Sequence, residues 1–218
     1  MFVGPNLGVY ENNPAKSGYD ILQNNKSVSS GAYWVKTSTM SSAQKMYVDM
    51  VTSGGGWTLI VCSETQGSAW NTTTVLSLNS STPSITSNYS ILNLADSLKT
   101  NLSGKLNYRI DAQTIGTYGG VWEADFDNTF TATSMSNAIA TNIIKYGTNW
   151  NINTSTTGTN SSLSNRMPWI DNNTQLLTTW NDYGSWWGTL ASANNGYNPA
   201  PYIHQVLEQP GIIWYWVK

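Results

Sequence analysis

Charged residues are scarce in this chain of 218 residues, where Lys, Arg, Asp and Glu together make up 10%. An average soluble protein carries about 25%. Asn, Ser and Thr take their place, and this exchange favours β-structure and polar loops, because long surface helices usually present Glu, Lys and Arg to solvent. The ten Lys and Arg residues are scattered, which argues against the basic patch that a nucleic-acid partner needs.

Cysteine and histidine each occur once, at Cys62 and His204. A single cysteine excludes an internal disulfide. Because Cys62 ends an apolar run, we expect it to be a small buried hydrophobe. His204 has neither metal-ligand nor triad spacing.

The N-terminal residues lack the basic and apolar regions of a signal peptide, and no apolar run approaches the length of a membrane span. We therefore expect no signal peptide and no membrane insertion.

Tryptophan and tyrosine are abundant, with eleven Trp and twelve Tyr against three Phe. These side chains combine an apolar ring with a polar donor, which suits half-exposed binding surfaces as well as cores. We expect most of them to lie in the core and a minority to line a binding surface.

Short strand-like segments separated by Asn, Ser and Gly clusters dominate the chain. The predicted strands cover residues 18–22, 31–36, 45–50, 54–62, 105–112, 119–133 and the aromatic end of 202–218. Helical spacing predicts helices over 90–102 and 134–147. Residues 1–16 are predicted to be a leader or linker and residues 17–218 a single domain, in which 66–88 and 148–165 are polar and turn-rich.

Three consecutive glycines, Gly54 to Gly56, precede Trp57. Glycine is costly in a strand, so the triplet indicates positive φ or close backbone approach. We predict a tight turn or bulge that directs Trp57 into the core. A phosphate-binding loop does not fit, because no Lys-Ser/Thr pair follows and the next element is a predicted strand.

The sequence around this turn resembles the N-terminal signature of the fibrinogen C-terminal-like domain, which intelectins share in part. The matching motifs are Ser30-Gly31-Ala32-Tyr33, Met46-Tyr47-Val48-Asp49-Met50 and Gly54-Gly55-Gly56-Trp57-Thr58. The likeness is strong over residues 17–62, faint in the middle and present again near the end. It implies a single α+β domain with twisted antiparallel sheets, few short helices and a loop-rich C-terminal lobe. Val48 replaces a family cysteine, so the usual disulfide is absent, which suggests folding in a reducing compartment.

The resemblance also implies a calcium loop, with Asp171 and Asn173 at its matching positions. Asp182 offers a second carboxylate nearby. Ca²⁺ prefers six to eight oxygen ligands, which carboxylates and amide carbonyls supply. A turn stabilised by its own Asn side chains explains the same residues without a metal.

A cluster of aromatic and amide side chains follows this loop and is the candidate ligand site. Its members are Trp180, Tyr183, Trp186, Trp187, Asn195 and Tyr197. Sugars present C–H faces that stack on aromatic rings, and hydroxyl groups that pair with amides. In a strand, one residue of the Trp186–Trp187 pair faces inward and the other outward; packing of both in the core is the alternative.

Three acids alternate at Glu123, Asp125 and Asp127, which places them on one face of a strand. They fit a metal site, a solvated strand face or edge, where charge discourages aggregation, or the paired carboxylates of a glycoside hydrolase.

We expect a non-enzymatic module that recognises a glycan or acetylated sugar on a cell surface, with calcium as its cofactor. Low charge and the missing disulfide suggest a phage tail adhesin, in a virion or extracellular setting. A homotrimer fits this role because weak sugar sites gain from multivalency. The alternatives are a virion structural or decoration protein, in contact with other virion proteins and without a ligand site, and a polysaccharide hydrolase.

Overall fold

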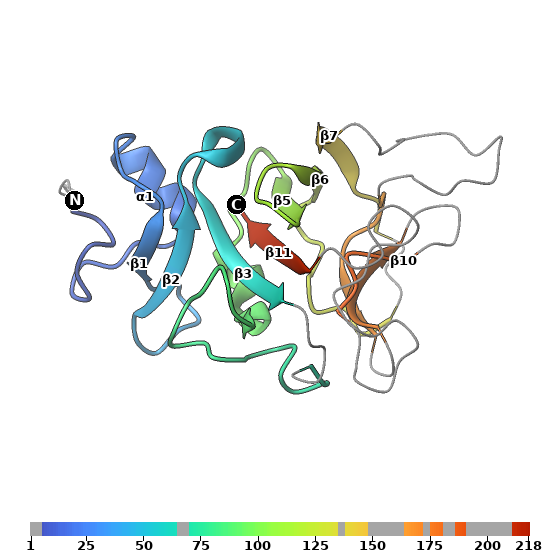
Figure 1. Ribbon diagram of the computed structural model, residues 1–218. Helices are drawn as coiled ribbons and strands as arrows, with labels where there is room; N and C mark the ends of the chain where they lie inside the picture. Colours follow the sequence, from blue (N-terminus) through green and yellow to red (C-terminus); the bar gives the residue numbers. More distant parts are fainter. Residues whose placement is uncertain are drawn as a thin grey trace.

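The computed structural model describes residues 6–64, 70–134, 138–147, 164–171, 175–180, 186–190 and 211–218. Its main sheet has the spatial order β1 (Gly31–Val35), β2 (Gln44–Asp49), β3 (Trp57–Glu64), β11 (Ile212–Val217), β5 (Lys105–Ala112), β6 (Tyr118–Asp125) and β7 (Thr141–Tyr146). The short β4 (Tyr89–Ser90) pairs with β3. A second sheet has the order β10 (Trp186–Trp187), β9 (Leu176–Trp180) and β8 (Trp169–Asp171). Figure 1 shows this small sheet at the right of the molecule.

All strand pairs in both sheets are antiparallel. The α-helices of the described residues are α1 (Gly18–Asn24) and α2 (Ala95–Leu98), and the 3₁₀ turns are η1 (Thr52–Gly54) and η3 (Leu92–Leu94). The predicted α+β class with antiparallel sheets and few short helices is therefore confirmed. Within the described ranges, no helix is long and apolar enough to cross a membrane.

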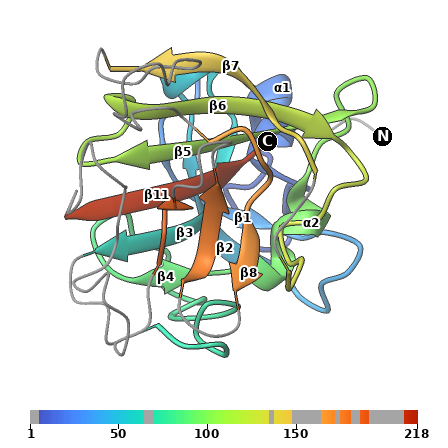
Figure 2. The same cartoon turned by 90° about the vertical axis from the view of Figure 1, so that its right-hand side faces the viewer.

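The strand at 212–217 lies at the centre of the main sheet, between β3 and β5 (Figure 2). Tyr215 pairs with Val61 on one side and with Ile110 on the other. Residues 213–217 are all buried. The backbone of β11 thus pairs with both halves of the sheet and joins them.

Two of the secondary-structure predictions are wrong. Residues 18–22 belong to α1, because the Ser17 hydroxyl accepts a hydrogen bond from the Asp20 amide at 3.2 Å and the buried residues, Gly18 and Ile21, are three apart. Residues 134–147 contain β7, which pairs with β6 along its length; pairing within the sheet outweighs the helical spacing. The predicted helix at 90–102 is confirmed only as η3 and α2.

Residues 6–16, part of the predicted leader, run along the outer edge of β1. The Trp34 amide donates to the Gly8 carbonyl at 2.7 Å, and the Ala15 amide donates to the Trp34 carbonyl at 3.0 Å. The Ala15 carbonyl accepts from the Lys36 amide at 2.8 Å, and Ala15 is fully buried. This segment therefore covers the β1 edge of the sheet.

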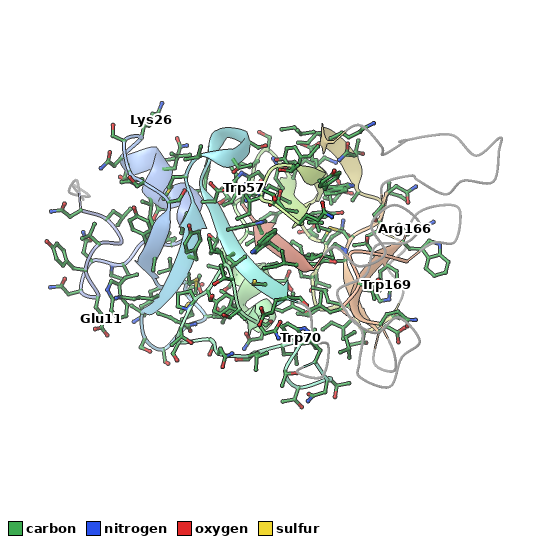
Figure 3. All side chains as sticks on the ribbon, viewed as in Figure 1. Glu11, Lys26, Trp57, Trp70, Arg166 and Trp169 are labelled. Atoms are coloured by element: carbon green, nitrogen blue, oxygen red, sulfur yellow. The ribbon has the colours of Figure 1, made fainter. Side chains whose placement is uncertain are left out.

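Tryptophan and tyrosine fill the core, as expected, and their polar atoms fix loops to the sheets. The largest fully buried side chains include Trp57, Trp70, Trp122, Trp169, Trp216, Tyr89, Tyr108 and Tyr215. The Trp122 indole donates to the Ser164 carbonyl at 2.7 Å, and the Trp214 indole to the Ile85 carbonyl at 2.8 Å. Figure 3 shows side chains packed densely between the labelled Trp57 and Trp70.

The glycine turn has the predicted role. Gly54, Gly55 and Gly56 have φ values of 80°, 66° and 77°. A Cβ atom on Gly55 would lie 2.2 Å from the Met50 carbonyl oxygen. Trp57 is 1% exposed, and its indole donates to the Thr52 carbonyl at 2.9 Å. The hydrogen bond between Trp57 and Thr52 thus spans the glycine turn and holds the indole in the core.

We predict that Gly55→Ala destabilises the protein by at least about 2 kcal/mol more than Gly104→Ala, because a steric clash is added to unfavourable φ. Gly104 is the matched control: its φ is 85°, but a Cβ there meets nothing within 4 Å. Urea denaturation of both variants measures the difference. Equal losses would show that the turn relaxes around the added methyl group.

Candidate functional site

The small sheet holds the described part of the predicted ligand site. In its register Trp186 lies opposite Trp180, and Trp187 lies opposite Thr179. Trp180 is half-buried, whereas Thr179 is fully buried. Directly opposed residues of an antiparallel pair lie on the same face of the sheet. Position 186 therefore lies on the same face of the sheet as Trp180, and position 187 on the same face as Thr179.

Aromatic side chains of the main sheet hold this small sheet in place. The Tyr108 hydroxyl donates to the Arg166 carbonyl at 3.0 Å, and the Tyr215 hydroxyl donates to the Gly188 carbonyl. The Trp122 indole donates to the Ser164 carbonyl. Figure 3 labels Trp169, the first residue of β8, and Arg166, which lies just before this strand, at the right of the molecule. The candidate site is thus attached to a rigid core at several separate points.

The Ser164 hydroxyl extends this attachment to the candidate site itself. It donates to the Trp180 carbonyl at 3.1 Å. The rings of Tyr108 and Trp122 stack with centroids 5.5 Å apart and planes 5° from parallel. Because the stacked pair is buried, the backbone of Trp180 has a fixed position relative to the core.

The predicted calcium loop is described only in part. Asp171 is half-buried at the end of β8, opposite Leu176 at the start of β9. Leu176 has a φ of 56°, in the left-handed region that is uncommon for residues other than glycine. Asn173 and Asp182 lie outside the described residues, and so do Tyr183, Asn195, Tyr197, His204 and the side chains of Trp186 and Trp187. Among the residues described, no group of three or more His, Cys, Asp or Glu is placed to hold a metal.

The alternating acids of β6 are partly neutralised by a neighbouring strand. Asp125 lies opposite Lys105 in the register, and the two charged groups are 2.5 Å apart. Glu123 is half-buried on the same strand, and Asp127 is exposed in the turn that follows. This arrangement favours a solvated, partly ion-paired strand face over a metal site or a pair of catalytic carboxylates.

A second charged cluster is buried at the centre of the main sheet. Arg109 is completely buried, and its guanidinium lies 2.7 Å from a carboxylate oxygen of Asp49 and 2.9 Å from one of Asp111. The indole rings of Trp216 and Trp57 flank it, with centroids 4.4 and 5.3 Å away. The cluster joins β2, β5 and the glycine turn. Because water and ligands have no access to Arg109, its role is structural.

The two carboxyl groups of this cluster respond differently to burial. Burial alone would raise the pKa of Asp49, but Arg109 and hydrogen bonds from Val51 and Thr52 outweigh it and lower the pKa. Burial dominates at Asp111 and raises its pKa despite the same guanidinium. The Arg109 guanidinium also donates a hydrogen bond of 2.7 Å to the Asp49 carboxylate.

The only cysteine is buried, as predicted. Burial raises the pKa of the Cys62 thiol to about 12. Nucleophilic and metal-binding cysteines act as thiolates, so Cys62 is an inert core side chain at neutral pH.

Neither a protein-family model nor a curated protein sequence matches this chain. Among solved structures, the chain is similar to the fibrinogen-like globe domain of human ANGPTL6. The TM-score is 0.47 and the sequence identity 12%, over 94% of this chain and 95% of that chain. This likeness concerns the course of the chain and carries no information about a ligand.

We predict that Arg109→Gln costs roughly 3–5 kcal/mol of folding free energy, because it leaves two buried carboxylates without their cation. Lys105→Gln, on the same strand, removes an ion pair whose side chains are 43% and 74% exposed, so solvent screens it and its loss should be much smaller. Chemical denaturation of both variants tests this. Similar small losses would contradict a central role for the Arg109 cluster.

We also predict that Tyr108→Phe loosens the small sheet, because the Arg166 carbonyl loses its buried donor, at a cost of about 1–3 kcal/mol. Amide hydrogen exchange should accelerate in β8 and β9 before it does in β3. Tyr33→Phe is the control, since the Tyr33 hydroxyl bonds the Ser29 carbonyl at an exposed position. Unchanged exchange in β8 and β9 would show that the attachment does not depend on this bond.

Proposed function

We propose that this protein is a recognition module that binds a glycan or acetylated sugar through the face of the small sheet that carries Trp180 and Trp186. The observation that supports it is the cross-strand placement of these two tryptophans beside a fully buried Thr179. A half-buried tryptophan such as Trp180, with a second tryptophan at the opposite register position, supports a flat apolar surface on which sugar C–H groups could stack.

The attachment of the small sheet supports binding with little reorganisation. Buried donors from Tyr108, Trp122 and Tyr215 fix the backbone on which the site is built. A site that is already ordered loses less conformational entropy when a ligand binds. This is an advantage for sugars, whose individual sites are weak.

The chemistry of the described residues supports binding rather than catalysis. Cys62 is protonated and buried, and Arg109 is sealed in the core. A glycoside hydrolase needs two carboxyl groups that flank the scissile bond, whereas Asp125 is paired with Lys105. The hydrolase alternative therefore has less support than a lectin-like function.

Calcium belongs to this proposal as the ion that would hold the loop after β8, with Asp171, Asn173 and Asp182 as its ligands.

The biological setting proposed is a phage tail adhesin, on a virion or outside the cell, in which a homotrimer would multiply weak sites. It is supported by the low charge and by the valine at position 48. The competing proposal is a virion structural protein whose tryptophans pack in a subunit interface.

The test is a broad glycan array, probed with calcium and again with a chelator. Trp186→Ala should weaken binding at least tenfold, as expected for a central aromatic contact, and more than Trp187→Ala does. Trp34→Ala is the control, because Trp34 is a half-buried tryptophan on β1, remote from the small sheet.

Each outcome bears on a different part of the proposal. Binding that survives chelation would remove calcium but keep the glycan site. An array that is blank in both conditions would favour the virion structural protein, with the tryptophans reassigned to packing.

A further inference from the structure

A cleft that does not involve the small sheet lies between α1, the end of β1 and the segment after α2. The cleft has a volume of about 770 Å³ and is lined by residues within 16–23, 36–38 and 97–101. This volume lies in the range of sites that hold small ligands. In Figure 1, α1 and β1 are at the left and the small sheet at the right, so this cleft is separate from the proposed glycan site.

Two lysines stand side by side at the rim of the cleft. The hydrogen bond from the Lys36 amide to the Ala15 carbonyl, 2.8 Å long, brings the backbone of Lys36 next to Lys16. Both side chains are exposed, and neither takes part in any of the ion pairs found among the described residues. Like charges carried by neighbouring backbone positions repel each other. An anion between the two ammonium groups would relieve this repulsion.

The other charged groups of the cleft are already engaged. The Asp20 carboxylate accepts the Lys16 amide at 2.9 Å and the Asn24 side-chain amide at 3.3 Å. The Lys99 ammonium donates to the carbonyls of Phe126 and Asn128 at 2.9 and 2.8 Å. Lys99 is thus a fixed part of the wall, and Lys16 and Lys36 are the cations that remain for a ligand.

The floor and the remaining wall of the cleft are rich in hydroxyl and amide groups. The Thr37 hydroxyl donates to the Ser97 hydroxyl at 3.1 Å, and the latter donates to the Leu94 carbonyl at 2.8 Å. This chain of hydrogen bonds ties the end of β1 to α2 and so fixes the width of the cleft. Ser38, Thr100 and Asn101 add further polar groups to the lining.

We propose that this cleft binds an acidic saccharide. Its carboxylate would lie between Lys16 and Lys36, and its hydroxyl groups would pair with the Ser, Thr and Asn side chains of the lining. A neutral sugar would leave the two ammonium groups without a partner. This site is independent of the glycan site proposed on the small sheet.

The test is titration calorimetry of the whole chain with a galacturonic acid trimer, and with a neutral galactose trimer as the ligand control. The Lys16→Gln/Lys36→Gln double variant should lose at least tenfold in affinity for the acidic trimer. Lys26→Gln/Lys145→Gln is the matched control, because it removes two exposed lysines outside the cleft and lowers the net charge equally. Its affinity should stay within twofold of the unmodified chain.

A steric variant checks the location. Ser38→Trp fills the cleft from an exposed position and should also reduce binding of the acidic trimer at least tenfold, whereas Trp186→Ala should leave it unchanged. Absence of binding to the unmodified chain, equal binding of both trimers, or equal losses in the two double variants would overturn the proposal. A loss caused by Trp186→Ala alone would assign the acidic sugar to the small sheet instead.

Discussion

The ion cluster around Arg109 is the constraint on which the main sheet depends. One guanidinium neutralises two carboxylates from different strands, and two indole rings cover it. Asp49 also accepts the amides of Val51 and Thr52 at 2.9 and 3.1 Å, so the turn before β3 is anchored to the same charge. The glycine turn, the Trp57 indole and the strand pairing between β2 and β3 are all arranged around this buried cation.

The cluster also links folding to pH in two opposite senses. Asp49, with its lowered pKa, stabilises the fold above its unfolded pKa, and this contribution disappears as the pH falls through the folded value. Asp111, with its raised pKa, costs stability above its unfolded value, and acidification relieves that cost. Acid therefore weakens the link between β2 and β5 while it makes the burial of Asp111 easier.

The sequence predicts most of the sheet but not the elements set by contacts between distant segments. Local signals located β3, β5 and β6, and the three glycines revealed the turn that seats Trp57. Residues 18–22 are too few for their periodicity to distinguish a helix from a strand, so the sequence predicts the wrong element there. The helix that forms depends on the cap at Ser17. The spacing of residues 134–147 fits a helix, yet pairing with β6 makes β7.

The candidate sites were predictable to different degrees. The Trp180–Trp186 pair stands out in the sequence as an aromatic cluster, but only the register of β9 and β10 distinguishes position 186 from 187. The sequence contains no local motif that predicts the cleft beside α1, because Lys16 and Lys36 become neighbours only through the segment that covers β1. No local pattern encodes a site assembled from three separate stretches of chain.

The central position of β11 has a consequence for how the protein is made. The ribosome synthesises β3 and β5 long before residues 212–217. Until β11 is made, the edges of β3 and β5 that will pair with it remain unpaired. Unpaired strand edges invite pairing with other chains, and contacts between distant segments form slowly. The nascent chain is therefore exposed to misassembly until β11 is inserted, and chaperone protection should matter most during this interval.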